Sequence, residues 1–154
     1  MNSDADASGI MAGKRGLVMG VANERSIAWG ISAAAAAQGA ELAFTYQGDA
    51  LKKRVEPLAA SVGSSLVMPC DVTDEASMDA VFDELKKTWG SIDFIVHAIA
   101  YSDKEELKGG YVDTTRDNFQ RTMDISVYSF TALARRAAEL MTDGGSMVTL
   151  TYYG

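Results

Sequence analysis

The sequence predicts an α/β fold in which a doubly wound parallel sheet is covered by helices on both faces. Short, almost continuously apolar runs alternate along the chain with longer stretches of helical periodicity. Strands that are apolar on both faces are typical of a buried parallel sheet, and intervening helices supply its crossovers. Right-handed crossovers then place ligand sites beyond the carboxyl ends of the strands. Function is therefore sought in the loops that follow the strands.

Five apolar runs are expected to form strands: residues 15–19 (RGLVM), 41–46 (ELAFTY), 65–69 (SLVMP), 92–100 (IDFIVHAIA) and 144–153 (GGSMVTLTYY). The helical patterns between them cover residues 26–38, 50–62, 73–89 and, with or without a bend, 115–141. Thr73 is the expected N-cap of the third helix, since two acidic residues follow it in the first turn. Apolar residues recur at helical spacing in that segment, and Gly90 ends it.

Composition indicates one globular domain and excludes several classes of function. The 154 residues are 47% hydrophobic and 23% charged, which is ordinary for such a domain. A net charge of −7 argues against binding to nucleic acid or to an anionic membrane, and no apolar run approaches the roughly 20 residues of a membrane span. Residues 1–11 lack the features of a secretory signal and are expected to form a disordered tail before a domain at 12–154.

A single cysteine and a single histidine allow neither an internal disulfide nor a cysteine/histidine metal cluster. No metal site is therefore expected, and a cytoplasmic location is favoured. Cys70 is interpreted as a small buried apolar residue, and His97 as a packing residue rather than an acid or base.

The loop VMGVANERSIAWG, residues 18–30, lies where the first strand should pass into the first helix. A phosphate site there needs a tight turn, free backbone N–H groups and a helix N-terminus. Gly20 can form the turn, and Ser26 can cap the helix and offer its hydroxyl to a pyrophosphate. An ordinary loop with a serine N-cap explains this stretch equally well.

Polar residues also follow the second and third strands. Gln47 stands where a dinucleotide-binding fold usually has an acidic residue for the ribose hydroxyls, and it brings no charge to a 2′-phosphate. Asp71 can accept a hydrogen bond from an adenine amino group while Val72 packs on the ring. Capping of the next helix is the equally weighted alternative for Asp71.

Several segments together resemble bacterial enoyl-acyl-carrier-protein reductases, a divergent branch of the short-chain dehydrogenase/reductase family. They are MGVANERSIAWGI, ELAFTYQ, CDV, IDFIVHAIA, DNFQRTMDISVYSF and TLTYYG, and the resemblance runs from about residue 12 to the end. In this branch a longer G-x-x-x-x-x-S-I-A turn replaces the glycine-rich loop. The resemblance implies a Rossmann-like fold and a pyrophosphate site of this variant type.

The resemblance also implies roles for individual residues. The cofactor, NAD as NADH, is bound by a set that follows the strands: Gly20, Ser26 and Ile27 at the pyrophosphate, Gln47 at the adenosine ribose, Asp71 and Val72 at the adenine, and Ile99 near the nicotinamide-side ribose. Ser102 matches a position that lines the acyl pocket. Tyr152 matches the first of two active-site tyrosines.

By the same resemblance the protein reduces the trans-2-enoyl thioester double bond of an acyl chain on acyl carrier protein, in fatty acid biosynthesis, as a homotetramer. The second tyrosine and the lysine of the family's Tyr-x6-Lys pattern do not occur in these residues, so the chain looks truncated and its sheet incomplete at the C-terminal end. We expect the 154 residues alone to be inactive. The alternatives are another short-chain dehydrogenase/reductase acting on an alcohol or ketone, and a non-catalytic dinucleotide-binding protein.

Overall fold

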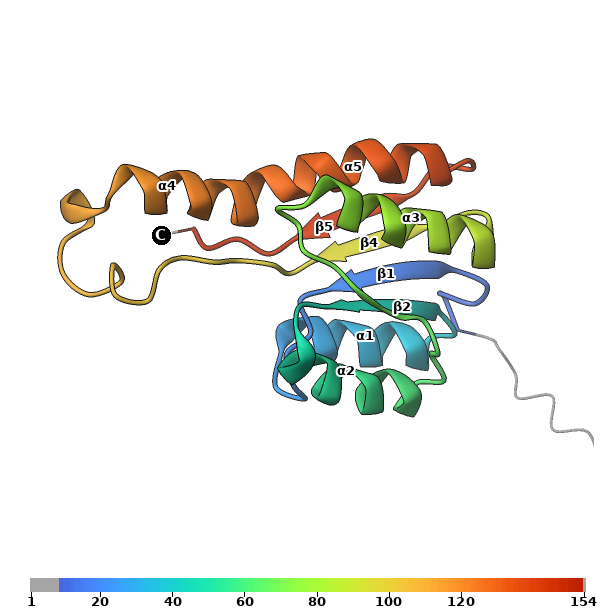
Figure 1. Ribbon diagram of the computed structural model, residues 1–154. Helices are drawn as coiled ribbons and strands as arrows, with labels where there is room; N and C mark the ends of the chain where they lie inside the picture. Colours follow the sequence, from blue (N-terminus) through green and yellow to red (C-terminus); the bar gives the residue numbers. More distant parts are fainter. Residues whose placement is uncertain (1–8, 154) are drawn as a thin grey trace, which may run out of the picture.

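A computed structural model describes residues 9–153 and shows a parallel sheet between two layers of helices (Figure 1). The five strands are β1 (Arg15–Met19), β2 (Glu41–Tyr46), β3 (Val67–Pro69), β4 (Phe94–His97) and β5 (Ser146–Thr149). Their order is β3-β2-β1-β4-β5, and every neighbouring pair is parallel. The predicted doubly wound parallel sheet is therefore confirmed.

The bounds of the strands depend on how far the backbone pairing extends. β1 and β2 have the predicted bounds, whereas β3, β4 and β5 are shorter than the apolar runs that contain them. The central strand β1 pairs with β2 on one side and β4 on the other, and its Leu17, Val18 and Met19 are at most 1% exposed. Burial on both faces explains why this strand is apolar at every one of these positions.

The helices are α1 (Ile27–Ala37), α2 (Asp49–Ser61), α3 (Glu75–Trp89), α4 (Arg116–Met123) and α5 (Ser129–Leu140). A π-helical segment, Asp124–Tyr128, joins α4 to α5, and a short 3₁₀ turn, Tyr111–Asp113, precedes α4. The expected helix from residue 115 to 141 is thus one helical run with a π-helical interruption. Thr115 caps it by accepting a hydrogen bond from the N–H of Asn118.

The prediction that Thr73 caps α3 is wrong. The N-cap is Asp74, whose carboxylate accepts from the N–H of Ala76. Thr73 instead donates both its N–H and its hydroxyl to the carboxylate of Asp71. The acidic side chain competes successfully for the cap because a charged acceptor makes the stronger bond to a helix N–H.

Two apolar clusters hold the three layers together. α1 and α2 cover one face of the sheet, and α3 with α5 covers the other (Figure 1). Alternate β1 side chains enter the two clusters, since Val18 packs toward α1 and α2 while Leu17 and Met19 pack toward α3 and α5. This alternation is the period of two expected of a strand.

The turn before β1 differs in part from the expected tail. Residues 1–8 lie outside the described residues. Gly9, Ile10 and Met11 form a turn in which the N–H groups of Ile10 and Met11 donate to the side chain and carbonyl of Gln38. These three residues are therefore attached to the end of α1 by hydrogen bonds.

The strands direct their carboxyl ends to one edge of the sheet, on the left in Figure 1, where α4 and the segment from residue 98 to 114 also lie. The strand order reverses between β1 and β4, because the chain builds outward from β1 to β3 and then returns to the other side of β1. Ligands of doubly wound sheets bind at such a reversal. Within residues 9–153 no helix is both long and apolar enough to cross a bilayer.

Candidate functional site

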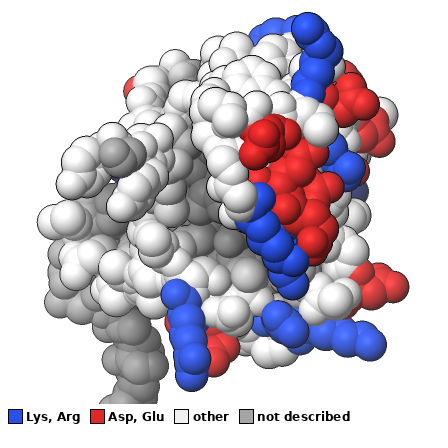
Figure 2. Space-filling view, turned by 90° about the vertical axis from the view of Figure 1, so that its left-hand side faces the viewer, with Lys and Arg blue, Asp and Glu red and all other residues white. Residues whose placement is uncertain are grey.

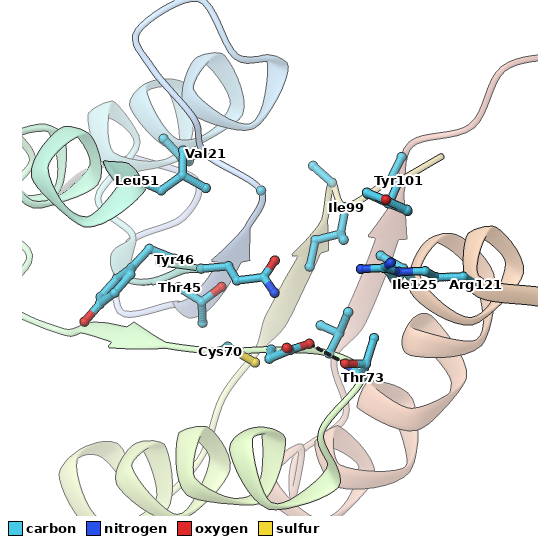
Figure 3. A pocket seen from close by; sticks show the side chains of 16 residues that line it. Val21, Thr45, Tyr46, Leu51, Cys70, Thr73, Ile99, Tyr101, Arg121 and Ile125 are labelled. Carbon is cyan, nitrogen blue, oxygen red and sulfur yellow. Dashed lines mark hydrogen bonds between the residues drawn. The ribbon is translucent and has the colours of Figure 1, made fainter. Parts of the chain in front are cut away.

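A cavity of about 300 Å³ opens at this reversal, beyond the carboxyl ends of β1 to β4. Figure 3 shows that side chains from both halves of the sheet and from the helical run after β4 point into it. It is lined by Gly20, Val21, Thr45, Tyr46, Gln47, Leu51, Cys70, Asp71, Val72, Thr73, Ala98, Ile99, Ala100, Tyr101, Arg121 and Ile125. Five residues predicted from the sequence, namely Gly20, Gln47, Asp71, Val72 and Ile99, are therefore brought together in its wall.

Gly20 is required by the close approach of two strand ends. Its φ is +108°, and a Cβ at this position would lie 2.0 Å from the carbonyl oxygen of Ala98. Neither the conformation nor the space admits a side chain. The turn after β1 thus keeps its backbone against the end of β4, and Gly20 lines the cavity at this point.

Ser26 organises the loop between β1 and α1. It occupies the N-cap of α1, but its side chain makes no bond to the helix. Its Oγ instead accepts hydrogen bonds from the N–H groups of Ala22 (2.9 Å) and Asn23 (3.0 Å). Both acceptor positions of the hydroxyl are then occupied, so the O–H remains as a donor.

The N-terminus of α1 adds further donors next to this hydroxyl. The carbonyl of Ser26 accepts from Trp29 and Gly30, but in residues 9–153 no hydrogen bond engages the N–H of Ile27 or Ala28. Ile27 has a 68% exposed side chain. Its contribution to a ligand site would therefore come from the backbone. A hydroxyl donor beside the positive end of an 11-residue helix suits an anionic group.

Asp71 stands at the end of β3 as an ionised acceptor. Its Oδ1 accepts from the N–H (2.9 Å) and hydroxyl (2.7 Å) of Thr73. These hydrogen bonds, with smaller contributions from Gln47 and from the positive charge of Arg121, hold the pKa of the Asp71 carboxyl below its usual range. Asp74, and not Asp71, caps α3, and Asp71 lines the cavity.

The helical run after β4 forms one wall of the cavity, and none of its lining residues was predicted from the sequence. Arg121 of α4 and Ile125 of the π-helical segment line the cavity four residues apart (Figure 3). The Arg121 guanidinium lies 4.8 Å from the centre of the Tyr101 ring. The DNFQRTMDISVYSF segment carries these residues, but nothing in its local pattern indicates which face turns toward the sheet.

His97 and Cys70 have the packing roles expected of them. His97 is fully buried, with Nδ1 2.8 Å from the hydroxyl of Thr149 and Nε2 2.7 Å from that of Ser129. Burial lowers the pKa of the imidazole, so the neutral ring is favoured. Burial also raises the pKa of the Cys70 thiol to about 11, although Cys70 lies in the wall of the cavity.

Four predicted residues do not line the cavity: Ser26 and Ile27, which belong to the loop and helix after β1, and Ser102 and Tyr152. The amide of the buried Asn118 donates to the hydroxyl of Ser102 (3.3 Å), and Ser102 does not line the cavity. The same Asn118 accepts from the N–H of Asp103, so it fixes the start of the segment after β4. Tyr152 follows β5, is 85% exposed and does not line the cavity. Its assignment to catalysis stays a prediction.

Charges of both signs are interspersed around this end of the molecule. Figure 2 faces the same edge, and its basic and acidic side chains lie next to one another among uncharged residues. Within the described part of the chain, no group of three or more histidine, cysteine, aspartate or glutamate side chains is arranged to hold a metal ion.

Comparison with known proteins identifies the family. The family model described as enoyl-(acyl carrier protein) reductase matches residues 20–154. The chain belongs to the enoyl-acyl-carrier-protein reductase family. A curated relative, enoyl-[acyl-carrier-protein] reductase [NADH] 1 of Rhizobium meliloti, is 68% identical to this reductase-family chain over 150 residues, which are 97% of the chain and 55% of the relative.

Solved structures of enoyl-acyl-carrier-protein reductases agree with the fold of this family member. The FabI crystal structure from Candidatus Liberibacter asiaticus has a TM-score of 0.93 at 55% identity and matches 95% of the chain and 57% of that protein. The reductase from Anaplasma phagocytophilum, solved in complex with NAD, has a TM-score of 0.91 at 56% identity, over 95% of the chain and 56% of that protein. The chain thus spans slightly more than half the length of these relatives.

Proposed function

We propose that this chain forms the cofactor-binding part of an NADH-dependent enoyl-acyl-carrier-protein reductase, which reduces the trans-2-enoyl thioester double bond in fatty acid biosynthesis. The observation that carries the proposal is the cavity at the strand reversal, in which Gly20, Gln47, Asp71, Val72 and Ile99 share one wall. The relative from Rhizobium meliloti is named as an NADH enzyme, and the Anaplasma phagocytophilum structure contains NAD.

The residues of the site fit a dinucleotide. The hydroxyl of Ser26 and the backbone N–H of Ile27 are donors at a helix N-terminus, which suits the pyrophosphate. Gln47 can hydrogen-bond the adenosine ribose without adding charge, and the ionised Asp71 can accept the adenine amino hydrogen. Gly20 lines the cavity where the turn after β1 meets the end of β4, and Ile99 borders the nicotinamide end.

NADH supplies a hydride for the β-carbon of the enoyl thioester. The negative charge that then develops at the thioester oxygen needs a hydrogen-bond donor. We assign Tyr152 to the active site on the resemblance of TLTYYG to the family, and Ser102 to the acyl pocket. Asn118 fixes the position of Ser102 relative to α4, since its side chain bonds the Ser102 hydroxyl and the N–H of Asp103.

We also propose that the protein acts as a homotetramer in the cytoplasm and receives its substrate on acyl carrier protein. Four apolar side chains of α4 and the π-helical segment support association between copies, since Phe119, Met123, Val127 and Tyr128 are each between 41% and 52% exposed. Apolar patches of this kind are typical of protein interfaces. Light scattering of the purified protein tests the tetramer, and a monomer at micromolar concentration would contradict it.

The central experiment measures NADH binding and enoyl-thioester-dependent NADH oxidation with the whole enzyme of which we propose this chain to be the cofactor-binding part. The whole enzyme should reduce a crotonyl thioester, but it should neither reduce a ketone with NADH nor oxidise an alcohol with NAD⁺. The 154 residues alone should not reduce the thioester. NADH binding without turnover of any enoyl thioester would favour a non-catalytic dinucleotide-binding protein. Absence of NADH binding would refute the proposal altogether.

A further inference from the structure

Two opposite charges face each other across the cavity and form no ion pair. Of the described residues that line it, Asp71 and Arg121 are the charged ones. Asp71 comes from the end of β3 and Arg121 from α4, and they form no ion pair. The charge of Arg121 nevertheless contributes to the lowered pKa of Asp71. A gap open to a ligand therefore separates an acceptor from a cation.

Arg121 is held in position by an aromatic ring instead of a carboxylate. Its guanidinium lies 4.8 Å from the centre of the Tyr101 ring, within the range of a cation–π contact. Within residues 9–153 its side chain takes part in no salt bridge or hydrogen bond, unlike Arg136, which binds Glu75 and Asp79. One face of the guanidinium thus covers Tyr101, and Figure 3 shows the side chain reaching into the cavity.

The Tyr101 platform is itself fixed to the helical run. Its N–H donates to Oγ of Ser126 (3.0 Å), and the same hydroxyl donates to the carbonyl of Tyr101 (3.2 Å). Ser126 lies in the π-helical segment, next to Ile125 in the cavity wall. The backbone of Tyr101 is therefore fixed against the helical run that carries Arg121, and the cation–π contact joins the two side chains before a ligand arrives. Such pre-organisation reduces the entropic cost of binding.

We propose that Arg121 stacks on the adenine of the bound cofactor, so that the adenine lies between Val72 and a guanidinium backed by Tyr101. This inference rests on the proposed function, because it needs a dinucleotide in the cavity. Adenine is a flat ring with an amino group on its edge, and it therefore suits both charges. Its amino group can donate to the Asp71 carboxylate while its face stacks on the Arg121 guanidinium. Arginine is suited to this role because its planar group stacks, whereas a lysine ammonium is a point charge.

The test compares dissociation constants of the purified protein and three variants, measured by fluorescence titration. Arg121→Ala should raise the Kd for NADH by about 3- to 30-fold, the range of a cation–π contact between exposed and desolvated sites. Arg121→Lys should recover only part of the affinity, because the ammonium keeps the charge but cannot stack a planar group on the adenine. Arg116→Ala removes a charge from the same helix outside the cavity and should bind NADH as the wild type does.

Ligand fragments locate the effect. ADP-ribose contains the adenine but no nicotinamide, so Arg121→Ala should weaken it by the same factor as NADH. An unchanged Kd for NADH, full affinity in Arg121→Lys, or a loss for NADH without a loss for ADP-ribose would each overturn the proposal. A loss confined to NADPH would also overturn it and would make Arg121 a phosphate contact. If the wild type fails to bind NADH, the proposed function itself is refuted.

Discussion

Replacement of Ser26 by alanine tests whether the loop after β1 binds the pyrophosphate. The hydroxyl accepts from the N–H groups of Ala22 at 2.9 Å and Asn23 at 3.0 Å, and only its own proton remains to be donated. A hydrogen bond to a charged acceptor contributes about 1–2 kcal/mol, so Ser26→Ala should raise the Kd for NADH by about 5- to 30-fold. The free energy of unfolding without cofactor should also fall, by about 1 kcal/mol, because the N–H groups of Ala22 and Asn23 lose their acceptor and hydrogen-bond water instead.

The two effects are separated by measuring both quantities on the same preparations. NADH affinity is obtained by fluorescence titration, and the free energy of unfolding by urea denaturation followed by circular dichroism. Ser26→Thr keeps a hydroxyl and should retain most of both. If Ser26→Ala lowers stability while the Kd for NADH is unchanged within error, the hydroxyl only supports the loop, and the assignment of the pyrophosphate to this residue is refuted.

Three further predictions concern Gln47, His97 and Cys70. NADH should be preferred to NADPH, because Gln47 offers no charge to a 2′-phosphate and Lys52 already pairs with Glu56 and covers Tyr46; equal kcat/KM values for the two cofactors would contradict this. The folded state keeps the pKa of His97 below 6.5, so as the pH decreases the unfolded chain binds a proton on this imidazole before the folded protein does. The free energy of unfolding should therefore fall below about pH 6.5. His97→Gln should flatten this part of the pH profile, and an unchanged slope would exclude His97 as the cause of the fall. The Cys70 thiol, with its pKa near 11, should react with a thiol reagent at neutral pH only when the protein unfolds, and rapid labelling of the native protein would show that the cavity exposes it.

Local sequence determined much of the site because strand ends are encoded by adjacent residues. Apolar runs define β1 and β2 to the residue, and the polar residues just after such runs must lie at the carboxyl edge of a parallel sheet. Gly20, Gln47, Asp71, Val72 and Ile99 accordingly line one cavity, and their roles in cofactor binding stay predictions. The family's variant turn also identified the loop around Ser26, although not the bonds of its hydroxyl.

Only the tertiary structure decided which residues lie opposite the carboxyl edge of the sheet. Arg121 and Ile125 reach the cavity because a π-helical segment and the packing of α5 on α3 set the direction of α4, and no local pattern specifies that direction. Competition between neighbouring acceptors likewise decided that Asp74, and not Thr73, caps α3, while Thr73 donates to Asp71. Sequence periodicity fixes which faces of an element are apolar, whereas the partner that each polar side chain meets depends on distances between elements far apart in the chain.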